Sequence, residues 1–281
     1  MSSSRQCAVL LADGSRSSMC EELERLEPKI AKYVDIVGQV LDLEDGAMPA
    51  DANLAIVFGG DGSILRAAHL MGENQIPVLG VNLGKLGFLA HVRPDKLEAA
   101  LPQVCSHEAC VVEHLMIDCS LVRDGKVVET RLGLNEASVL AGPPFSMIEV
   151  QLYVDAQLAT TYSCDGLIVS TPVGSTAHSL SAGGPILRKT MQAFVISPIS
   201  PHTLTNRPVV DSADQVFELA VPEPNNGTSL MLDGKVMAQL ESGDRVRIAR
   251  SDATFKLLDI PGQGYYRTLR EKLGWGGQLR G

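Results

Sequence analysis

FGGDGSILRA, residues 58–67, decides the fold, because it places three glycines around one carboxylate directly after the apolar run 54–57. Glycine is costly inside regular structure, so such a cluster indicates either a tight turn or a backbone that approaches a ligand closely. The residues that follow have the composition of a helix. A buried strand, a glycine-rich turn and a helix in this order are typical of a parallel sheet, in which ligands bind at the carboxyl ends of the strands.

The composition is that of an acidic globular protein. The 281 residues are 45% hydrophobic and carry a formal net charge of -9. An acidic surface disfavours nonspecific binding to nucleic acid or membranes, and no apolar run approaches the roughly 20 residues that span a bilayer. None of the six cysteines forms a Cys-x-x-Cys pair. We therefore expect no metal held by side chains, and free thiols in a reducing cytoplasm.

The pattern of secondary structure changes along the chain. Up to residue 108, strand-like and helix-like segments alternate, which predicts an α/β domain with a Rossmann-like parallel sheet. Residues 109–260 contain many short strand-like runs separated by turn signals such as Asp233-Gly234, which predicts a β-rich, sandwich-like domain. Residues 261–281 are interpreted as a C-terminal tail with a helix that packs back on the first domain.

Asp61 is the unusual member of the glycine-rich loop. The backbone N–H groups of Gly59, Gly60, Gly62 and Ser63, at the start of a helix, are suited to bind the phosphate oxygens of a donor. A carboxylate beside phosphate is repulsive unless it accepts a proton from an attacking hydroxyl or organises a metal ion. The structural alternative is an Asp-Gly turn in which Asp61 caps the following helix. The loop by itself leaves both readings open.

Two further glycine-rich segments follow predicted strands. DGLIVSTPVGSTAHSLSAGGPIL, residues 165–187, combines tight turns with small hydroxyl side chains, which suits contacts to a ribose and a base. The other segment is GVNLGKLGFLA, residues 80–90. Ser175 and Thr176 also suit a second, structural interpretation as helix caps. Three such loops in one chain favour a ligand site over three independent turns.

These segments resemble those of the NAD kinases, which phosphorylate the 2′-hydroxyl of the adenosine ribose of NAD. The blocks that carry the resemblance, in the family's order, are GGDGS (59–63), GVNLGKLGFLA (80–90), LNEAS (134–138), residues 165–187, ISPISPHTLTNRP (196–208) and LDGK (232–235). The resemblance implies that NAD and ATP, or polyphosphate in place of ATP, are the substrates. It also implies a divalent cation, with Mg²⁺ expected, and a homo-oligomer, either a dimer or a tetramer.

The resemblance further implies a role for each matching residue. Asp61 is expected to be the catalytic base or orienting group for the 2′-hydroxyl, with Gly60 and Gly62 against phosphate or ribose. Phe88 is expected to line the adenine side of the site. The other residues expected to contact NAD, some of them across a subunit interface, are Asn135, Glu136, Asp165, Thr176, Ala177, His178 and Ser181.

Four positions depart from the family's pattern. Ser63 stands where Thr is usual, and Val173 replaces a common Thr. His178 stands where Tyr is usual, and Ser163 occupies a place often held by Arg. The last two changes put ligand affinity in question, because an imidazole replaces a phenol ring and one positive charge is lost.

Two other functions compete with NAD phosphorylation. A lipid kinase of the diacylglycerol or sphingosine type shares the glycine–aspartate loop, but it is not expected to carry the LNEAS and GSTA blocks. A regulator that binds NAD(P) without turnover is the second alternative. The intact loop around Asp61 argues against it, whereas His178 and Ser163 keep it open. A turnover assay separates the regulator from an enzyme.

Overall fold

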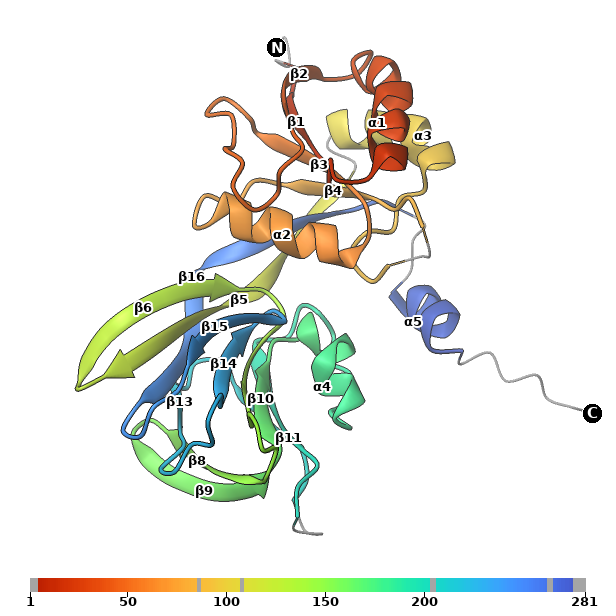
Figure 1. Ribbon diagram of the computed structural model, residues 1–281. Coiled ribbons are helices and arrows are strands. Elements are labelled where there is room, and N and C mark those ends of the chain that lie inside the picture. Colours follow the sequence, from red (N-terminus) through yellow and green to blue (C-terminus); the bar gives the residue numbers. More distant parts are fainter. Residues whose placement is uncertain (1–4, 85–86, 107–108, 203–205, 262–264, 275–281) are drawn as a thin grey trace, which may run out of the picture. The chain divides into compact units, whose positions relative to one another are not determined.

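The computed structural model describes residues 5–84, 87–106, 109–202, 206–261 and 265–274 (Figure 1). Parts of two family blocks and of the predicted tail lie outside these described residues, namely 85–86, 203–205, 262–264 and 275–281. The chain divides into two compact units. The first unit is Met1–Glu113 together with Phe255–Gly281, and the second is His114–Thr254. The predicted domain boundaries, at residues 108–109 and 260–261, stay a prediction.

The first unit contains a parallel sheet. Its strands, in spatial order, are β2 (Asp35–Val40), β1 (Cys7–Leu11), β3 (Leu54–Phe58), β4 (Val78–Val81) and the last part of β16 (Arg245–Asp259). The paired strands of this sheet run parallel. β3 and β4 are buried along their whole length. Their unbroken apolar sequences are explained by this burial, because helices cover both faces of a parallel sheet.

The helices of the first unit follow from apolar residues at helical spacing. They are α1 (Ser17–Ile30), α2 (Asp61–Met71), α3 (Pro94–Cys105) and α5 (Tyr265–Leu273). The buried residues of α1, for example, are Met19, Leu23, Leu26 and Ile30. Figure 1 shows α1 and α3 on one face of the sheet and α2 on the other. The glycine-rich loop between β3 and α2 therefore lies at the carboxyl edge of the sheet, beside the loops that follow β1 and β4.

The second unit contains two largely antiparallel sheets. One is formed by β5 (Cys110–Arg123), β6 (Lys126–Gly133), β8 (Ile148–Val154), β9 (Gln157–Cys164), β13 (Phe217–Ala220) and the first part of β16. The other has, in spatial order, β12 (Val209–Ser212), β11 (Ala193–Ile199), β10 (Gly166–Ser170), β7 (Glu136–Leu140), β14 (Ser229–Leu232) and β15 (Lys235–Gln239). Two short helices follow β10, η1 (Gly174–Thr176) and α4 (His178–Ser181).

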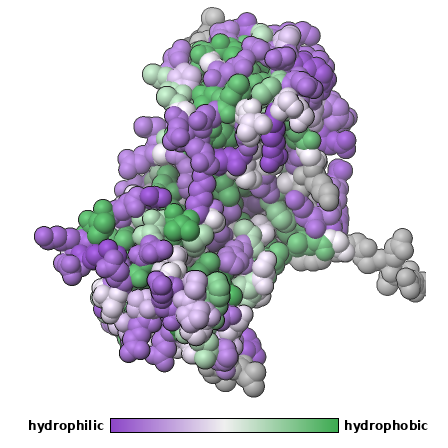
Figure 2. All heavy atoms as spheres, in the orientation of Figure 1, coloured by the Kyte–Doolittle hydropathy of each residue, from purple (hydrophilic) through white to green (hydrophobic). Residues whose placement is uncertain are grey.

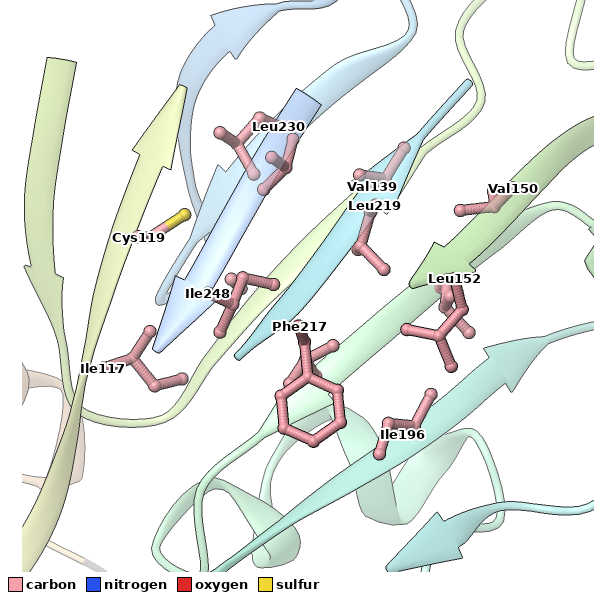
Figure 3. Close-up of a cluster of buried hydrophobic side chains, with 14 of the residues drawn as sticks. Ile117, Cys119, Val139, Val150, Leu152, Ile196, Phe217, Leu219, Leu230 and Ile248 are labelled. Atoms are coloured by element: carbon pink, nitrogen blue, oxygen red, sulfur yellow. The ribbon is translucent and has the colours of Figure 1, made fainter. Parts of the chain in front are cut away.

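Side chains of both sheets meet in one hydrophobic core. Figure 3 shows Val139 and Leu230 of the second sheet near Phe217 and Ile248 of the first. The rings of Phe194 and Phe217 meet edge to face, with centroids 5.8 Å apart. Two sheets that share a core in this way form a sandwich. The predicted fold class, an α/β domain followed by a β-rich domain, is confirmed.

Candidate active site

The glycines of the GGDGS loop differ in what the fold requires of them. Gly59 has a φ of +138°, and a Cβ atom there would lie 2.2 Å from the Ser63 Oγ atom. A side chain at Gly59 is therefore excluded by the protein itself. Around Gly60 and Gly62, nothing among the described residues lies within 4 Å of a Cβ position, and neither residue has a positive φ. The fold explains Gly59, whereas the space above Gly60 and Gly62 is open to a ligand.

Asp61 is the first residue of α2, and its side chain binds a different loop. The Oδ2 atom accepts a hydrogen bond from the Phe88 N–H at 2.8 Å. The Oδ1 atom accepts two more, from Leu89 at 2.8 Å and from Ala90 at 3.1 Å. A Cβ atom on Gly87 would lie 2.2 Å from Oδ1, so glycine is needed there. Two predicted site residues, Asp61 and Phe88, are thus held together, and the carboxylate anchors a loop rather than capping α2.

The Asp61 carboxylate keeps capacity for one further partner. A carboxylate offers about four lone-pair positions, and the three amides of residues 88–90 occupy three of them. Asp61 is half-buried, so this part of the site is within reach of a ligand. A hydroxyl group is a suitable partner, because it would donate a hydrogen bond to the remaining position.

Ser63 and Arg66 lie in the first turns of α2, and a hydrogen bond or an ion pair holds each of them within the first unit. Ser63 is buried, and its N–H donates to the Gly60 carbonyl at 3.0 Å. Arg66 forms an ion pair with Asp13 at 3.1 Å. Hydrogen bonds from Ser15 hold the pKa of Asp13 below its ordinary value, and the Arg66 charge adds to this effect. Arg66 therefore connects α2 to the loop after β1.

In the second unit, the LNEAS block lies against the segment 165–187. Thr171 donates from its hydroxyl to the Leu134 carbonyl at 2.7 Å, and from its N–H to the Asn135 carbonyl at 2.8 Å. A Cβ atom on Gly174 would lie 2.1 Å from the Asn135 carbonyl oxygen. Glycine at this position allows the two backbones to approach closely. The two blocks that the sequence singles out therefore form one local structure.

The turn after β10 uses several of its hydroxyl groups within the protein. Ser175 is fully buried, donates to the Pro172 carbonyl at 2.7 Å and accepts from the Leu187 N–H at 3.0 Å. Thr176 is half-buried, and its hydroxyl donates to the Val173 carbonyl at 3.1 Å. Ser175 is thus a structural residue, but neither it nor Thr176 is a helix cap, because the N-caps of η1 and α4 are Val173 and Ala177 and no side chain caps either helix. Thr176 retains an exposed part.

Three further predicted NAD contacts lie on or beside α4. Ala177 is half-buried, and His178 and Ser181 are exposed. The N–H of Ala182, the C-cap of this short helix, donates a hydrogen bond to the backbone carbonyl of His178. The His178 imidazole takes no part in that bond. All three residues are within reach of a ligand, and they follow Thr176 directly in the chain.

Asp165 lies away from this cluster. It precedes β10, whereas Thr171 follows β10 and contacts Asn135. With a rise of about 3.3 Å per residue, Asp165 and Thr171, which flank this strand, are about 20 Å apart. One copy of the chain therefore brings Asn135 and the turn around Thr176 together, but it places Asp165 at the opposite end of β10.

Glu136 begins β7 and is only 5% exposed. Burial, and then the negative charge of the nearby Asp233, raise the pKa of Glu136 to about 8. At pH 7 the side chain is therefore mostly protonated. Its Oε2 atom is buried and has no hydrogen-bond partner within the described ranges. A protonated carboxyl group can donate a hydrogen bond, so Glu136 has unused capacity to bind a ligand.

Asp233 is a residue of this region to which the sequence assigns nothing beyond a turn. Its carboxylate accepts hydrogen bonds from the N–H groups of Leu134 at 2.7 Å, Asn135 at 2.7 Å and Glu136 at 3.0 Å. The available signal in the sequence is an Asp-Gly turn within the LDGK block. The contact itself joins residues almost a hundred positions apart, so local patterns do not reveal it.

A cavity of about 1100 Å³ lies in the first unit, and the GGDGS loop does not line it. Several basic side chains surround it, but most have acidic partners. Lys29 pairs with Glu98 at 3.6 Å, and Arg267 pairs with Glu271 at 2.7 Å. None of the predicted site residues lines this cavity. With its charges largely neutralised, it does not argue for a phosphate site.

The described residues do not form a metal-binding cluster. No group of three or more His, Cys, Asp or Glu side chains within them is placed to hold a metal ion. Mg²⁺ usually keeps several waters and binds one or two carboxylates together with substrate phosphates. Asp61, with one lone-pair position left, fits a cation that is held mainly by phosphates.

Phosphoryl transfer to a hydroxyl is served by a carboxylate that can accept the hydroxyl proton and by backbone amides that can bind phosphate. Asp61 and the open glycine loop meet both requirements, and the hydroxyl-rich turn of the second unit suits a nucleoside. The fold and the site therefore define the class of protein as a nucleotide-dependent kinase.

Comparison with known proteins identifies the family. Residues 11–109 match the ATP-NAD kinase N-terminal domain, and residues 134–260 match the ATP-NAD kinase C-terminal domain. The NAD kinase of Rhodopirellula baltica is 52% identical over 271 residues, which cover 96% of this chain and 87% of that protein. The chain belongs to the NAD kinase family. The predicted family and enzyme class are confirmed, which argues against the lipid kinase alternative.

Two solved structures share the fold. Yeast NADH kinase, complexed with NADH, has a TM-score of 0.83 and 21% identity, covering 99% of this chain and 90% of that one. An NAD kinase from Archaeoglobus fulgidus, in complex with ATP, has a TM-score of 0.75 and 26% identity, covering 97% of this chain and 100% of that one. The similarity spans almost the whole chain, so both units belong to the shared fold.

Proposed function

We propose that this chain transfers the terminal phosphoryl group of ATP to the 2′-hydroxyl of the adenosine ribose of NAD, producing NADP and ADP. The observation that carries the proposal is the Asp61 carboxylate, which the amides of residues 88–90 hold at the end of β3 with one lone-pair position left. Membership of the NAD kinase family supports the choice of substrates. The related enzyme that binds ATP supports the choice of donor.

The reaction exchanges one phosphorus–oxygen bond for another. The 2′-oxygen of NAD attacks the terminal phosphorus in line, and the bond from this phosphorus to the bridging oxygen of ADP breaks. Asp61 accepts the proton of the hydroxyl. The donor phosphates lie against the backbone at Gly60 and Gly62, where the space is open. The N–H groups of Gly59 and Ser63 already donate to the Val81 and Gly60 carbonyls. Such a transfer needs positioning and charge stabilisation more than covalent help, so we expect no covalent enzyme intermediate.

NAD is bound by groups from three loops in this proposal. Phe88, whose N–H is held by Asp61, lines the adenine side. Asn135 and Glu136 bind the ribose or diphosphate, and the unused Oε2 atom of Glu136 supports this role. The remaining contacts to base and ribose come from Asp165, Thr176, Ala177, His178 and Ser181.

Mg²⁺ is the divalent cation of the proposal. When bound, it neutralises charge on the donor phosphates. Phosphate oxygens and water would hold it, because the one remaining lone-pair position of Asp61 serves the 2′-hydroxyl in this proposal. The net charge of -9 supports a cation as the neutralising group. Polyphosphate, with the same phosphoryl chemistry, is the alternative donor.

The chain acts as a homo-oligomer, a dimer or a tetramer, in this proposal. A second copy is the simplest source of Asp165 for NAD bound beside Asn135, because the two residues lie at opposite ends of β10. Exposed hydrophobic side chains also support association. Val127 and Val128 of β6 are 59% and 58% exposed, and Figure 2 shows hydrophobic side chains among hydrophilic ones over the β5–β6 hairpin.

A cytoplasmic location completes the proposal. All six cysteines are free, which suits a reducing compartment. Within the described parts of the chain, no helix has the length and apolar character needed to cross a membrane.

The test measures NADP formation from NAD and ATP with Mg²⁺, using a coupled dehydrogenase specific for NADP. We expect wild-type turnover, and a fall in kcat of about 10²- to 10⁴-fold in Asp61→Asn, the usual loss for a general base. Asp42→Asn is the matched control, because Asp42 also accepts backbone hydrogen bonds in the first unit, from Glu44 at 2.9 Å and Asp45 at 3.1 Å. Polyphosphate in place of ATP identifies the range of donors.

Calorimetric binding of NAD separates the two roles of Asp61. If Asp61→Asn has a low kcat but wild-type NAD affinity, Asp61 acts as the general base. If kcat and NAD affinity fall equally, the main role of Asp61 is to anchor residues 88–90. Full activity in Asp61→Asn contradicts the proposed mechanism. A wild-type protein that binds NAD without turnover is the regulator, and the proposed function is then wrong.

A further inference from the structure

The turn between β14 and β15 has a defined geometry. Asp233 and Gly234 are its two central residues, with φ values of +47° and +78°. Two consecutive positive φ values are typical of the tight hairpin turn that Asp-Gly favours. Aspartate is one of the few residues with a side chain that tolerates this region of φ. The position of the Asp233 carboxylate is therefore set by a short and well-determined turn.

Strand register places this turn beside Glu136. β14 pairs antiparallel with β7, and Leu232 lies opposite Ala137. The next residue along, Asp233, comes opposite Glu136. Its N–H donates to the Glu136 carbonyl at 2.9 Å, and its carboxylate accepts from the N–H groups of Leu134, Asn135 and Glu136. Four hydrogen bonds thus join one aspartate to three consecutive residues.

Two of these three residues, Leu134 and Asn135, are also held from their other side by the end of β10. The Thr171 hydroxyl donates to the Leu134 carbonyl, and both the Thr171 N–H and the Ser170 hydroxyl donate to the Asn135 carbonyl. Donors and acceptors of this backbone segment are therefore satisfied within the protein. With the backbone bound on both sides, the directions of the Asn135 and Glu136 side chains depend on these partners.

We infer that Asp233 is a positioning residue for NAD: its carboxylate fixes the backbone of residues 134–136 and so directs the side chains of Asn135 and Glu136 toward the substrate. The inference rests on the proposed function, in which these two side chains bind NAD. Asp233 acts through them and makes no contact with the substrate. Bonds from amides to an ionised carboxylate are stronger than neutral ones, so a neutral side chain of the same shape should weaken the segment.

The experiment compares Asp233→Asn with Asp155→Asn in steady-state kinetics. Asp155 is a close match, because it begins the β8–β9 hairpin turn with a φ of +46°. Its N–H donates to the Val216 carbonyl at 2.9 Å, and its carboxylate accepts from the Val216 N–H at 3.0 Å. An asparagine at 233 has one acceptor oxygen instead of two, so at least one of the three amides loses its partner.

We expect Asp233→Asn to raise the KM for NAD about tenfold, the equivalent of one lost hydrogen bond to a charged group. The KM for ATP should stay within about twofold of wild type, and Asp155→Asn should change neither value, because surface turns away from a site have small effects. Amide hydrogen exchange at residues 134–136 should accelerate in Asp233→Asn alone. This readout does not depend on turnover.

A KM for NAD that stays at the wild-type value in Asp233→Asn overturns the inference. Equal changes in kcat and in both KM values also overturn it, because they indicate general loss of folding. If Asp233→Asn fails to fold, the same measurements are made on Asp233→Ser, which keeps one hydrogen-bond acceptor in the turn. If the wild type binds NAD without forming NADP, the proposed function fails, and calorimetric NAD affinity then decides the role of Asp233.

Discussion

At the scale of single residues, two aspartates perform the same structural task. Asp61 binds the amides of residues 88–90, and Asp233 binds those of residues 134–136. In each case one carboxylate satisfies three consecutive N–H groups of a loop that carries predicted NAD contacts. A single ionised side chain can do this because its two oxygens offer about four lone-pair positions. Both loops are thereby fixed without a ligand.

Glu136 gives a prediction about the pH dependence of stability. Its pKa is about 8 in the folded protein, against an ordinary value of 4.5. Between these values, the folded protein retains a proton that the unfolded chain has released, so the free energy of unfolding falls as pH rises through this window. The slope is at most about 1.4 kcal/mol per pH unit. Glu136→Gln, which does not titrate, should lose this slope.

Thermal unfolding at pH 5.5, 7 and 8.5 checks this prediction. Relative to wild type, Glu136→Gln should gain stability steadily from the lowest to the highest pH. Glu149→Gln serves as the control, since Glu149 is an exposed residue on β8. A constant difference between wild type and Glu136→Gln across this range would show that Glu136 is ionised in the folded protein.

At the scale of secondary structure elements, the sequence predicts the structure of short, continuous segments. The apolar run 54–57 followed by glycines specifies a strand, a turn and a helix, because burial and backbone freedom are encoded within ten residues. The contact of Asp61 with residues 88–90 is not predictable in this way, since it depends on how β3 and β4 pair. The resemblance to NAD kinases names Asp61 and Phe88 as site residues, but it does not supply the hydrogen bond between them.

The junction between β10 and β7 gives a prediction at this scale. Thr171 is fully buried, donates to the Leu134 carbonyl and accepts from the Gly174 N–H at 3.1 Å. Thr171→Val keeps the shape of the side chain but removes its hydroxyl, so the Leu134 carbonyl and the Gly174 N–H both lose this hydrogen-bond partner. We expect the free energy of unfolding to fall by about 2–3 kcal/mol, the cost of unsatisfied buried polar groups. Urea denaturation measures the change.

Thr161→Val is the control for this substitution, since Thr161 is exposed on β9. Its effect should stay within about 0.5 kcal/mol, as is usual for surface substitutions. A loss below that value for Thr171→Val would mean that water or a rearranged backbone replaces the threonine hydroxyl. The junction would then contribute little to holding the LNEAS block.

At the scale of the whole molecule, the position of Asp165 cannot be reconciled with a compact site formed by one copy of the second unit. The resemblance places Asp165 among the NAD contacts, yet it lies at the other end of β10 from Thr171, the residue that contacts Asn135, about 20 Å away along the strand. Sequence motifs report which residues serve a site, but they carry no information on which copy supplies each residue. The homo-oligomer that we propose would resolve this, because in a symmetric assembly each copy can give Asp165 to the site of its neighbour.

Mixing two inactive variants tests this arrangement. Asn135→Ala and Asp165→Ala each remove one residue from every site of a homo-oligomer. If each site takes Asn135 from one copy and Asp165 from another, random 1:1 mixing restores both residues in about a quarter of the sites. We therefore expect about a quarter of wild-type NADP formation after the two variants are refolded together. A mixture of Asn135→Ala and Glu136→Ala should recover nothing, since those residues come from one copy. Two results would contradict this arrangement: an active protein that is monomeric by light scattering, or a mixture in which no activity is recovered. Either result would place Asp165 in the site of its own chain or outside the site.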